Sequence, residues 1–305
     1  MTTDTPPITG PKNEDTGAGL AFALGAYVFW GFLPLYMKML AHIPAPEIIA
    51  HRVVWSVPIA GVVLLLLRRT DDLKAALRTP RVLAMALLTA ALVSFNWGVY
   101  VWAISNDRAL DAALGYYINP LFSVALGALI LKEALSRAQL IAIALAVAAV
   151  GVLTFEAGSL PVVALGLTIS WGIYAFFRKT LPVGANQGFL LEVLILTPFA
   201  LAYMVWLWGT GQAFFLAGVP SNTWLLVGCG FVTATPLMLY ANGAKLLRLS
   251  TIGILQYIAP TMIFLIAVFV FGEPFGRGEA IAFPMIWVAL IIYSTSMVRQ
   301  MRKRG

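Results

Sequence analysis

The sequence predicts an all-α integral membrane protein in which ten transmembrane helices form two inverted five-helix repeats. Of its 305 residues, 61% are hydrophobic and only 11% are charged, whereas a soluble domain of average usage carries about 25% charge. Ten apolar segments reach the roughly 20 residues that a helix needs to cross a bilayer. A four-residue motif and several scarce residue types also recur 140 residues later. Composition, segment length and repetition therefore indicate the same membrane bundle.

The predicted spans are separated by short breaks that contain charged residues, glycine or proline. Clear examples are the breaks at Arg68–Asp72, Lys132–Glu133, Glu156–Gly158 and Gly272–Pro274. Such residues end an apolar helix because they need water or a turn conformation. The spans are predicted at residues 18–40, 47–67, 81–104, 109–131, 137–155, 160–179, 187–207, 222–244, 250–271 and 278–298.

Polar segments flank the predicted bundle. Residues 1–17 are rich in proline and threonine, so we expect a disordered tail without the basic segment and cleavage site of a signal peptide. Residues 300–305 form a basic tail. The single cysteine, Cys229, lies in an apolar run and has no partner for an intrachain disulfide.

A repeat is indicated by the motif Tyr117–Pro120, which returns as Tyr257–Pro260. Only 5 of 28 positions match between residues 110–137 and 250–277. However, tyrosine, proline, glutamate and arginine are scarce in membrane spans, and here they recur in phase. The pairs at the same spacing are Tyr100 and Tyr240, Arg108 and Arg248, Glu133 and Glu273, and Arg137 and Arg277.

A weaker similarity extends the repeat toward the start of the chain. Trp30-Gly31 recurs as Trp171-Gly172 at a spacing of 141 residues, which implies one inserted or deleted residue. We therefore interpret residues 18–155 and 156–299 as two copies of one five-helix unit.

The distribution of basic residues predicts the orientation in the membrane. With both termini in the cytoplasm, 16 of the 20 Lys and Arg residues lie on the cytoplasmic side, as the positive-inside rule requires. The net charge of +7 then follows from topology and implies no nucleic-acid partner. Because five is an odd number, the second copy enters the membrane from the opposite side. Inverted repeats of this kind place a binding site near the midplane, between two related ends.

These features resemble the EamA branch of the drug/metabolite transporter superfamily, which has a proline in spans four and nine and a glutamate at their ends. Four other motifs are similar to those of RarD-type permeases: Trp30–Pro34, Glu47–Arg52, Asn96–Trp97 and Leu114–Leu121. The second half is more divergent, since Ala259 replaces the asparagine of the first motif. The resemblance implies a transporter of small metabolites or drugs in the bacterial inner membrane. RarD-like proteins are linked by name to chloramphenicol, and wider relatives export amino acids.

Polar and aromatic residues in the middle of spans are the candidates for substrate binding. Small-molecule sites are mostly apolar walls with a few polar groups, so we expect a cavity that suits a flat, amphiphilic molecule. The alternative is that each of these side chains only packs in the core. The candidates are Trp30, Asn96, Trp97, Tyr100, Tyr116, Tyr117, Asn119, Trp171, Tyr174, Tyr240, Gln256 and Tyr257. We expect Trp206, Trp208 and Trp224 to be interfacial anchors instead.

Three prolines within spans are candidate hinges: Pro34, Pro120 and Pro260. A proline cannot donate a hydrogen bond to the carbonyl four residues before it. The freed carbonyl of Tyr116 or Gln256 would be costly in lipid unless a neighbour or cavity water satisfied it. The alternative is that the prolines only curve their helices for packing.

Charged residues inside spans are a further signal. A charge within a span costs about 2.5–3.5 kcal/mol on insertion scales, so it usually has a partner and a role. We hypothesise that Arg52 binds the carboxylate of Glu47, of Glu192 or of a substrate; a structural ion pair or a side chain that reaches the interface is the alternative. Glu192 is the candidate for proton coupling, and we expect such coupling to be weak or absent.

The favoured function is a secondary transporter that works by alternating access on a small aromatic or amphiphilic molecule, amino-acid-like or chloramphenicol-like. The sequence lacks a zinc-hydrolase motif, a nucleophile paired with a base and an ATP-binding loop. We therefore expect no catalytic residue, metal or cofactor. A lipid-linked metabolite flippase, a channel and a non-transporting membrane sensor remain alternatives. We expect a monomer or a weak homodimer.

Overall fold

The computed structural model describes residues 16–67, 70–132, 135–244, 246–247 and 249–302, and all regular structure in them is helical. The predicted tail 1–17 lies outside these residues except for Thr16 and Gly17, and residues 303–305, Glu133 and Arg248 also lie outside them. Residues 300–302 of the predicted basic tail belong to the last helix. The helices are α1 (Gly17–Met39), α2 (Ala45–Leu66), α3 (Thr70–Leu77), α4 (Pro80–Ser105), α5 (Ala109–Leu131), α6 (Arg137–Ala157), α7 (Val162–Thr180), α8 (Ala185–Gly209), α9 (Pro220–Ala244), α10 (Leu249–Leu255), α11 (Ile258–Phe269) and α12 (Arg277–Arg302).

The predicted spans each correspond to a helix or a helix pair. In the described part of the chain, nine apolar stretches are long enough to cross a membrane, and α7 carries a shorter one, Val162–Arg178. The ninth span is interrupted between α10 and α11 at residues 256–257. Pro260 lies just after this interruption and has no N–H to bond the carbonyl of Gln256.

Helix α3 lies where the sequence predicted only a break. Its one apolar side packs on the bundle: Ala76 is buried in a cluster with Val82 of α4 and Leu191 of α8, and Leu73 packs against that cluster. The short helix is therefore stabilised by tertiary packing, as helices of this length must be in water.

Polar side chains fix the starts of several helices. The Thr16 hydroxyl accepts a hydrogen bond from the backbone N–H of Gly19 at 3.0 Å and so caps α1. At α6, Ser136 accepts from the Gln139 N–H at 3.3 Å, and the Gln139 side chain accepts from the Ser136 N–H at 2.8 Å. Such reciprocal bonds satisfy backbone donors that a helix start leaves unpaired.

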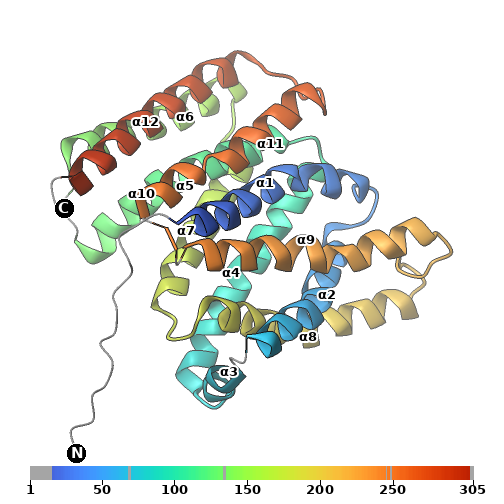
Figure 1. Cartoon of the computed structure of the whole chain (residues 1–305). Helices are drawn as coiled ribbons and strands as arrows, with labels where there is room; N and C mark the ends of the chain where they lie inside the picture. The colour runs from blue at the N-terminus through green and yellow to red at the C-terminus, as the bar shows by residue number, and fades with distance from the viewer. Residues whose placement is uncertain (1–15, 68–69, 133–134, 245, 248, 303–305) are drawn as a thin grey trace, which may run out of the picture.

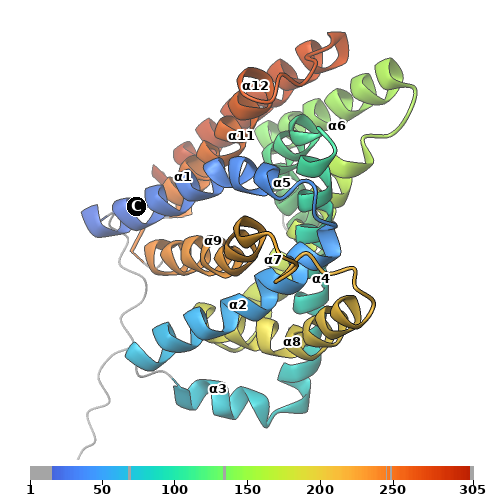
Figure 2. The ribbon, with the colours of Figure 1, turned by 90° about the vertical axis from the view of Figure 1, so that its right-hand side faces the viewer.

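The helices pack around a central space. Helix α6 lies beside α12 on one lateral side of the bundle, and α2 lies beside α8 on the opposite side (Figure 1). Helix α9 lies between α1 and α2 and contacts both of them (Figure 2). Helices α4, α5 and α7 contact one another on the far side of this space. Both halves of the chain thus contribute helices to the centre.

Glycine allows α5 and α7 to approach closely. A Cβ atom on Gly115 would lie 2.8 Å from the backbone oxygen of Ala164. The Thr168 hydroxyl also donates to the Gly115 carbonyl at 2.9 Å. This contact sets the positions of Tyr116 and Trp171, which follow Gly115 and Thr168 on the two helices.

The two halves share a helix order and a backbone detail. Helices α1, α2, α4, α5 and α6 correspond in order to α7, α8, α9, the α10–α11 pair and α12. Lys132 ends α5 with a φ of 55°, and Gly272, 140 residues later, follows α11 with a φ of 68°. The equivalent turns therefore use the same left-handed conformation. The exact residue at which one repeat ends stays a prediction.

Candidate functional site

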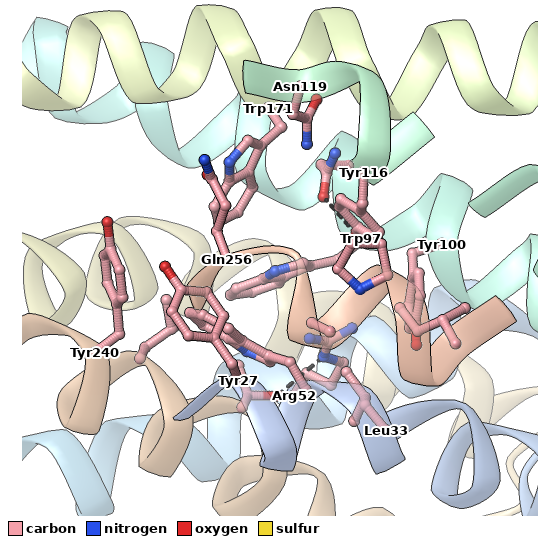
Figure 3. A pocket seen from close by; sticks show the side chains of 17 residues that line it. Tyr27, Leu33, Arg52, Trp97, Tyr100, Tyr116, Asn119, Trp171, Tyr240 and Gln256 are labelled. Carbon is pink, nitrogen blue, oxygen red and sulfur yellow. Dashed lines mark hydrogen bonds between the residues drawn. The ribbon is translucent and has the colours of Figure 1, made fainter. Parts of the chain in front are cut away.

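A cavity of about 150 Å³ lies between the two halves of the chain (Figure 3). Its walls come from α1, α2, α4, α5, α7, α9, α11 and the break that precedes α11. Ten of the thirteen predicted binding residues line it. The described residues that line it are Tyr27, Trp30, Leu33, Arg52, Asn96, Trp97, Tyr100, Tyr116, Asn119, Trp171, Thr233, Leu237, Tyr240, Gln256, Ala259, Pro260 and Ile263.

Residues related by the repeat meet in this cavity. Five pairs of lining residues stand at the repeat spacing of 140 or 141. They are Trp30 and Trp171, Trp97 and Leu237, Tyr100 and Tyr240, Tyr116 and Gln256, and Asn119 and Ala259. The cavity therefore lies where the repeats face each other, which is where inverted-repeat transporters hold their substrates.

Aromatic rings form two groups on the cavity walls. Tyr27, Trp30 and Tyr240 contact one another with ring centroids 5.7–5.9 Å apart. Tyr100 and Tyr116 form a second group, with centroids 5.9 Å apart. Such spacings are favourable for tilted and edge-to-face ring pairs. Figure 3 shows Tyr27 and Tyr240 on one side of Trp97 and Tyr100 on the other.

Arg52 carries a charged group into the cavity. Its side chain is buried, and its Nε donates to the Thr233 hydroxyl at 2.9 Å. Its guanidinium carbon lies 4.6 Å from the centre of the Trp97 ring, a cation–π distance. Nη1 of Arg52 is buried without a hydrogen-bond partner.

A network of amide and hydroxyl groups orients Asn96. Its Nδ2 donates to the Leu167 carbonyl at 3.1 Å and to the Ser170 hydroxyl at 2.9 Å, both on α7. The Tyr116 hydroxyl donates to Oδ1 of Asn96 at 3.4 Å. By contrast, Oδ1 of Asn119 is buried without a partner. The cavity thus combines fixed polar groups with unpartnered ones, such as Oδ1 of Asn119, that can bind a ligand.

Three predicted binding residues lie away from the cavity. Tyr117 points to the other side of α5, where its hydroxyl and the Thr261 hydroxyl are 2.7 Å apart. The Tyr174 hydroxyl donates to Glu192 at 3.3 Å. Tyr257 packs against the large core cluster at the break before α11. Adjacent tyrosines 116 and 117 cannot face the same way because successive helical residues are about 100° apart.

The three candidate hinges differ from one another. Helix α5 continues through Pro120, and α1 continues through Pro34. Neither of these prolines lines the cavity, whereas Pro260 does and stands beside the break between α10 and α11. A discontinuous span at a binding site is typical of transporters with inverted repeats.

The acidic residues inside spans have partners other than Arg52. Glu192 is 1% exposed, and its Oε1 lies 3.4 Å from Nε of Arg178 in an ion pair. Glu47 accepts hydrogen bonds from the N–H groups of Phe214 and Phe215 at 2.8 and 3.1 Å. The hypothesis that either carboxylate pairs with Arg52 is therefore wrong, and Glu192 does not line the cavity.

The two halves are also joined at one end of the bundle. This end, which we call the distal face, holds the loops at residues 40–44, 106–108, 158–161, 210–219 and 270–276. Glu273 in the last of these loops accepts from the N–H groups of Ala109 and Leu110 at 2.6 and 2.8 Å. Burial raises the pKa of Glu273, and these two donors oppose the rise. Together with the bonds to Glu47, these contacts hold the distal ends of the halves together.

Sequence reasoning missed two polar lining residues, Tyr27 and Thr233. Tyr27 stands three residues before Trp30, so the face that carries Trp30 also carries Tyr27. Thr233 gives no such signal, because its hydroxyl also donates to the Cys229 carbonyl at 2.7 Å, an ordinary bond for threonine in a helix.

Comparison with known proteins gives close relatives over almost the whole chain. The model of the EamA-like transporter family matches residues 17–155. An uncharacterized transporter of Vibrio cholerae is 43% identical over 93% of this chain and 94% of its own length. Protein RarD of Escherichia coli is 38% identical over 95% and 98%. The chloramphenicol-sensitive protein RarD of Pseudomonas aeruginosa is 32% identical over 95% and 98%.

A solved crystal structure superposes on this chain with a TM-score of 0.61, over 94% of this chain and all of the other. The two sequences are 20% identical, so this similarity shows the fold alone.

The fold and the cavity together define a multi-pass membrane transporter that handles a small molecule. Its relatives are permeases and not enzymes. The chain belongs to the EamA family of drug/metabolite transporters, as a RarD-type permease of the bacterial inner membrane. The predicted fold class, an all-α integral membrane protein of the drug/metabolite transporter fold, is confirmed.

Proposed function

We propose that the protein moves a small aromatic or amphiphilic metabolite across the inner membrane by alternating access at the central cavity. The observation that carries this proposal is the meeting of five repeat-related residue pairs in one cavity. Two similar half-sites of opposite orientation support a mechanism in which either end of the bundle opens in turn.

The contacts at the distal face support such a mechanism. Glu273 and Glu47 each bond backbone N–H groups of the other half, and release of these bonds would let the distal ends separate. The interrupted span beside Pro260 supplies a place where one element can bend while the rest stays packed. In the present conformation the two halves meet at the distal face.

The size of the cavity favours a small substrate. Pockets for drug-sized ligands occupy roughly 300–1,000 Å³, and this cavity occupies about 150 Å³. An amino-acid-sized molecule therefore fits the present conformation better than a chloramphenicol-sized one. A larger ligand would require the halves to separate first.

The proposed orientation, with both termini in the cytoplasm, predicts a labelling pattern. Lys132 and Phe275 are both exposed and lie at opposite ends of the bundle, and the native Cys229 is fully buried. In intact cells, an impermeant maleimide is expected to label Phe275→Cys and to label Lys132→Cys only after permeabilisation. Gly272 stands at the repeat spacing from Lys132, but it has a positive φ that a cysteine would strain. Phe275, in the same loop, is therefore the labelling site. Labelling of both variants from outside would contradict the inverted arrangement.

Saturable counterflow is the expected result for a carrier. Amino acids, nucleosides and aromatic antibiotics, chloramphenicol included, are screened by thermal shift, and each ligand that binds is tested in proteoliposomes.

Trp97→Ala is expected to raise the half-saturation concentration at least about tenfold, or about 1.4 kcal/mol, because Trp97 forms a cavity wall and faces Arg52. Trp224→Ala is the matched control, since Trp224 is 73% exposed and does not line the cavity. Ligand binding without counterflow would favour a sensor over a carrier.

A further inference from the structure

The Arg52 guanidinium brings a positive charge into the cavity without an acidic partner. Arginine stays protonated in proteins, and Arg52 is 3% exposed. Among the described residues, the ion pairs join Lys38 to Asp107, Arg108 to Asp111 and Arg178 to Glu192, and none includes Arg52. Among the described residues that line the cavity, Arg52 is the only one with a formal charge.

The Arg52 guanidinium does not lie at the membrane–water interface. Its Nε donates to Thr233, which lies in the middle of α9, and its guanidinium lies over Trp97, well inside α4. A side chain that extends to the interface would have its charged group near the end of a helix. The charge is therefore held at depth by two specific contacts.

The contacts of Arg52 leave most of its donors unused. A guanidinium has five N–H donors, and with the described residues Arg52 makes only the Nε bond to Thr233. Nη1 is buried and unpartnered, and so is the hydroxyl of Tyr100, which lines the same cavity. Figure 3 shows the Arg52 guanidinium beneath Trp97, with Tyr100 to one side of it. A ligand with two adjacent acceptor oxygens would satisfy such donors.

We propose that Arg52 binds the carboxylate of a monoanionic organic substrate, a conclusion that rests on the proposed transport function. One negative charge neutralises the charge of Arg52, whereas a phosphate dianion would need a second cation, and the described lining residues supply none. Arginine binds carboxylates through two parallel hydrogen bonds. The aromatic walls hold the apolar body of the substrate. Neutral molecules of the same shape leave the guanidinium unpaired and bind more weakly.

The test compares acids with their uncharged amides. Benzoate and benzamide, and phenylacetate and phenylacetamide, are titrated into the purified full-length protein at neutral pH. The acids are expected to bind at least about tenfold more tightly than the amides. Arg52→Gln is expected to remove this preference, and Arg52→Lys, which keeps the charge, to retain part of it. Arg108→Gln is the control, because Arg108 pairs with Asp111 at the distal face.

The outcomes separate this inference from the proposed function. Acids that bind no better than amides, or a preference that survives in folded Arg52→Gln protein, would overturn the inference. Chloride or inorganic phosphate binding as tightly as the acids would also overturn it. Should Arg52→Gln fail to fold, the acid–amide difference in wild type and in Arg52→Lys decides the question. If the amides show counterflow as efficient as that of the acids, the proposed transport function stands and the proposed carboxylate recognition is overturned. If the acids bind selectively but show no counterflow, the carboxylate recognition stands and the transport function is overturned.

Discussion

Replacing Gly230 with alanine is expected to destabilise the protein by about 1–3 kcal/mol or more, the usual cost of overpacking a close contact. A methyl group at Gly230 on α9 would overlap the backbone carbonyl of Trp55 on α2. Backbone atoms cannot rotate away as a side chain can, so the two helices must separate. The measurement is the midpoint of thermal unfolding in detergent, together with the fraction of monodisperse protein.

The same substitution is expected to damage the cavity. Gly230 and Thr233 lie three residues apart on α9, and Trp55 and Arg52 lie three residues apart on α2, so each pair shares one helix face. Separation of the helices would break the bond between Arg52 and Thr233. Ligand binding by the surviving folded protein should therefore weaken as well.

A glycine without close neighbours provides the control. Gly61 on α2 has no atom within 4 Å of the position that a Cβ would occupy, so alanine fits there. Gly61→Ala should leave the unfolding midpoint unchanged or raise it, because alanine favours helix by about 1 kcal/mol over glycine. Equal stability of the two variants would mean that α2 and α9 are packed less closely than the structure indicates.

The fold could be predicted from the sequence because membrane spans follow simple rules. Length and apolar composition identify each span without knowledge of its neighbours. The repeat added more, since it related Tyr100 to Tyr240 and Trp30 to Trp171, and these residues do meet at the cavity. Helix α3 was missed because its stability comes from packing on α4 and α8, which periodicity in eight residues does not reveal.

The candidate site was predictable only in part because sequence does not give the rotation of each helix. Tyr116 and Tyr117 were equally good candidates, and only Tyr116 faces the cavity. The hydroxyl of Thr233 has no sequence signal that separates it from other threonines in helices. Arg52 was identified as a charge at depth, but its partner depended on which helix lies opposite, and that helix is α9.

The partner of Glu192 shows a further limit. Arg178 lies near the end of α7, so positive-inside reasoning treats it as a cytoplasmic charge. Counted from the loop that joins α7 to α8, Glu192 lies about five residues farther along its helix than Arg178 does, which is about 7.5 Å. A long arginine side chain spans such an offset when it turns inward. The sequence pattern does not distinguish this inward orientation from an outward one.

Glu192→Gln is expected to cost about 3–5 kcal/mol of stability, as does the removal of one partner from a buried ion pair. Glu192 is 1% exposed, and the Arg178 side chain is 15% exposed. The change removes the negative charge that faces Arg178 and weakens the acceptor for the Tyr174 hydroxyl. The unfolding midpoint and the yield of folded protein should both fall.

A double-mutant cycle tests whether the pair itself is responsible. In the double variant Arg178→Gln with Glu192→Gln, neither buried charge remains, so its destabilisation should be smaller than the sum of the two single effects. Asp111→Asn is the matched control, because the Arg108–Asp111 pair is partly exposed and such pairs contribute about 0–1 kcal/mol. Additive single effects would show that the charges act independently of each other.

The cycle also separates a structural role of Glu192 from proton coupling. A coupling carboxylate must exchange protons with the substrate pathway, whereas Glu192 lies outside the cavity lining and is paired with Arg178. The structural role predicts loss of stability in Glu192→Gln, with unchanged substrate-driven proton movement in sealed vesicles that contain the protein that remains folded. The coupling role predicts normal stability and loss of substrate-driven proton movement in sealed vesicles. Because the two roles predict opposite results in both measurements, one variant decides between them.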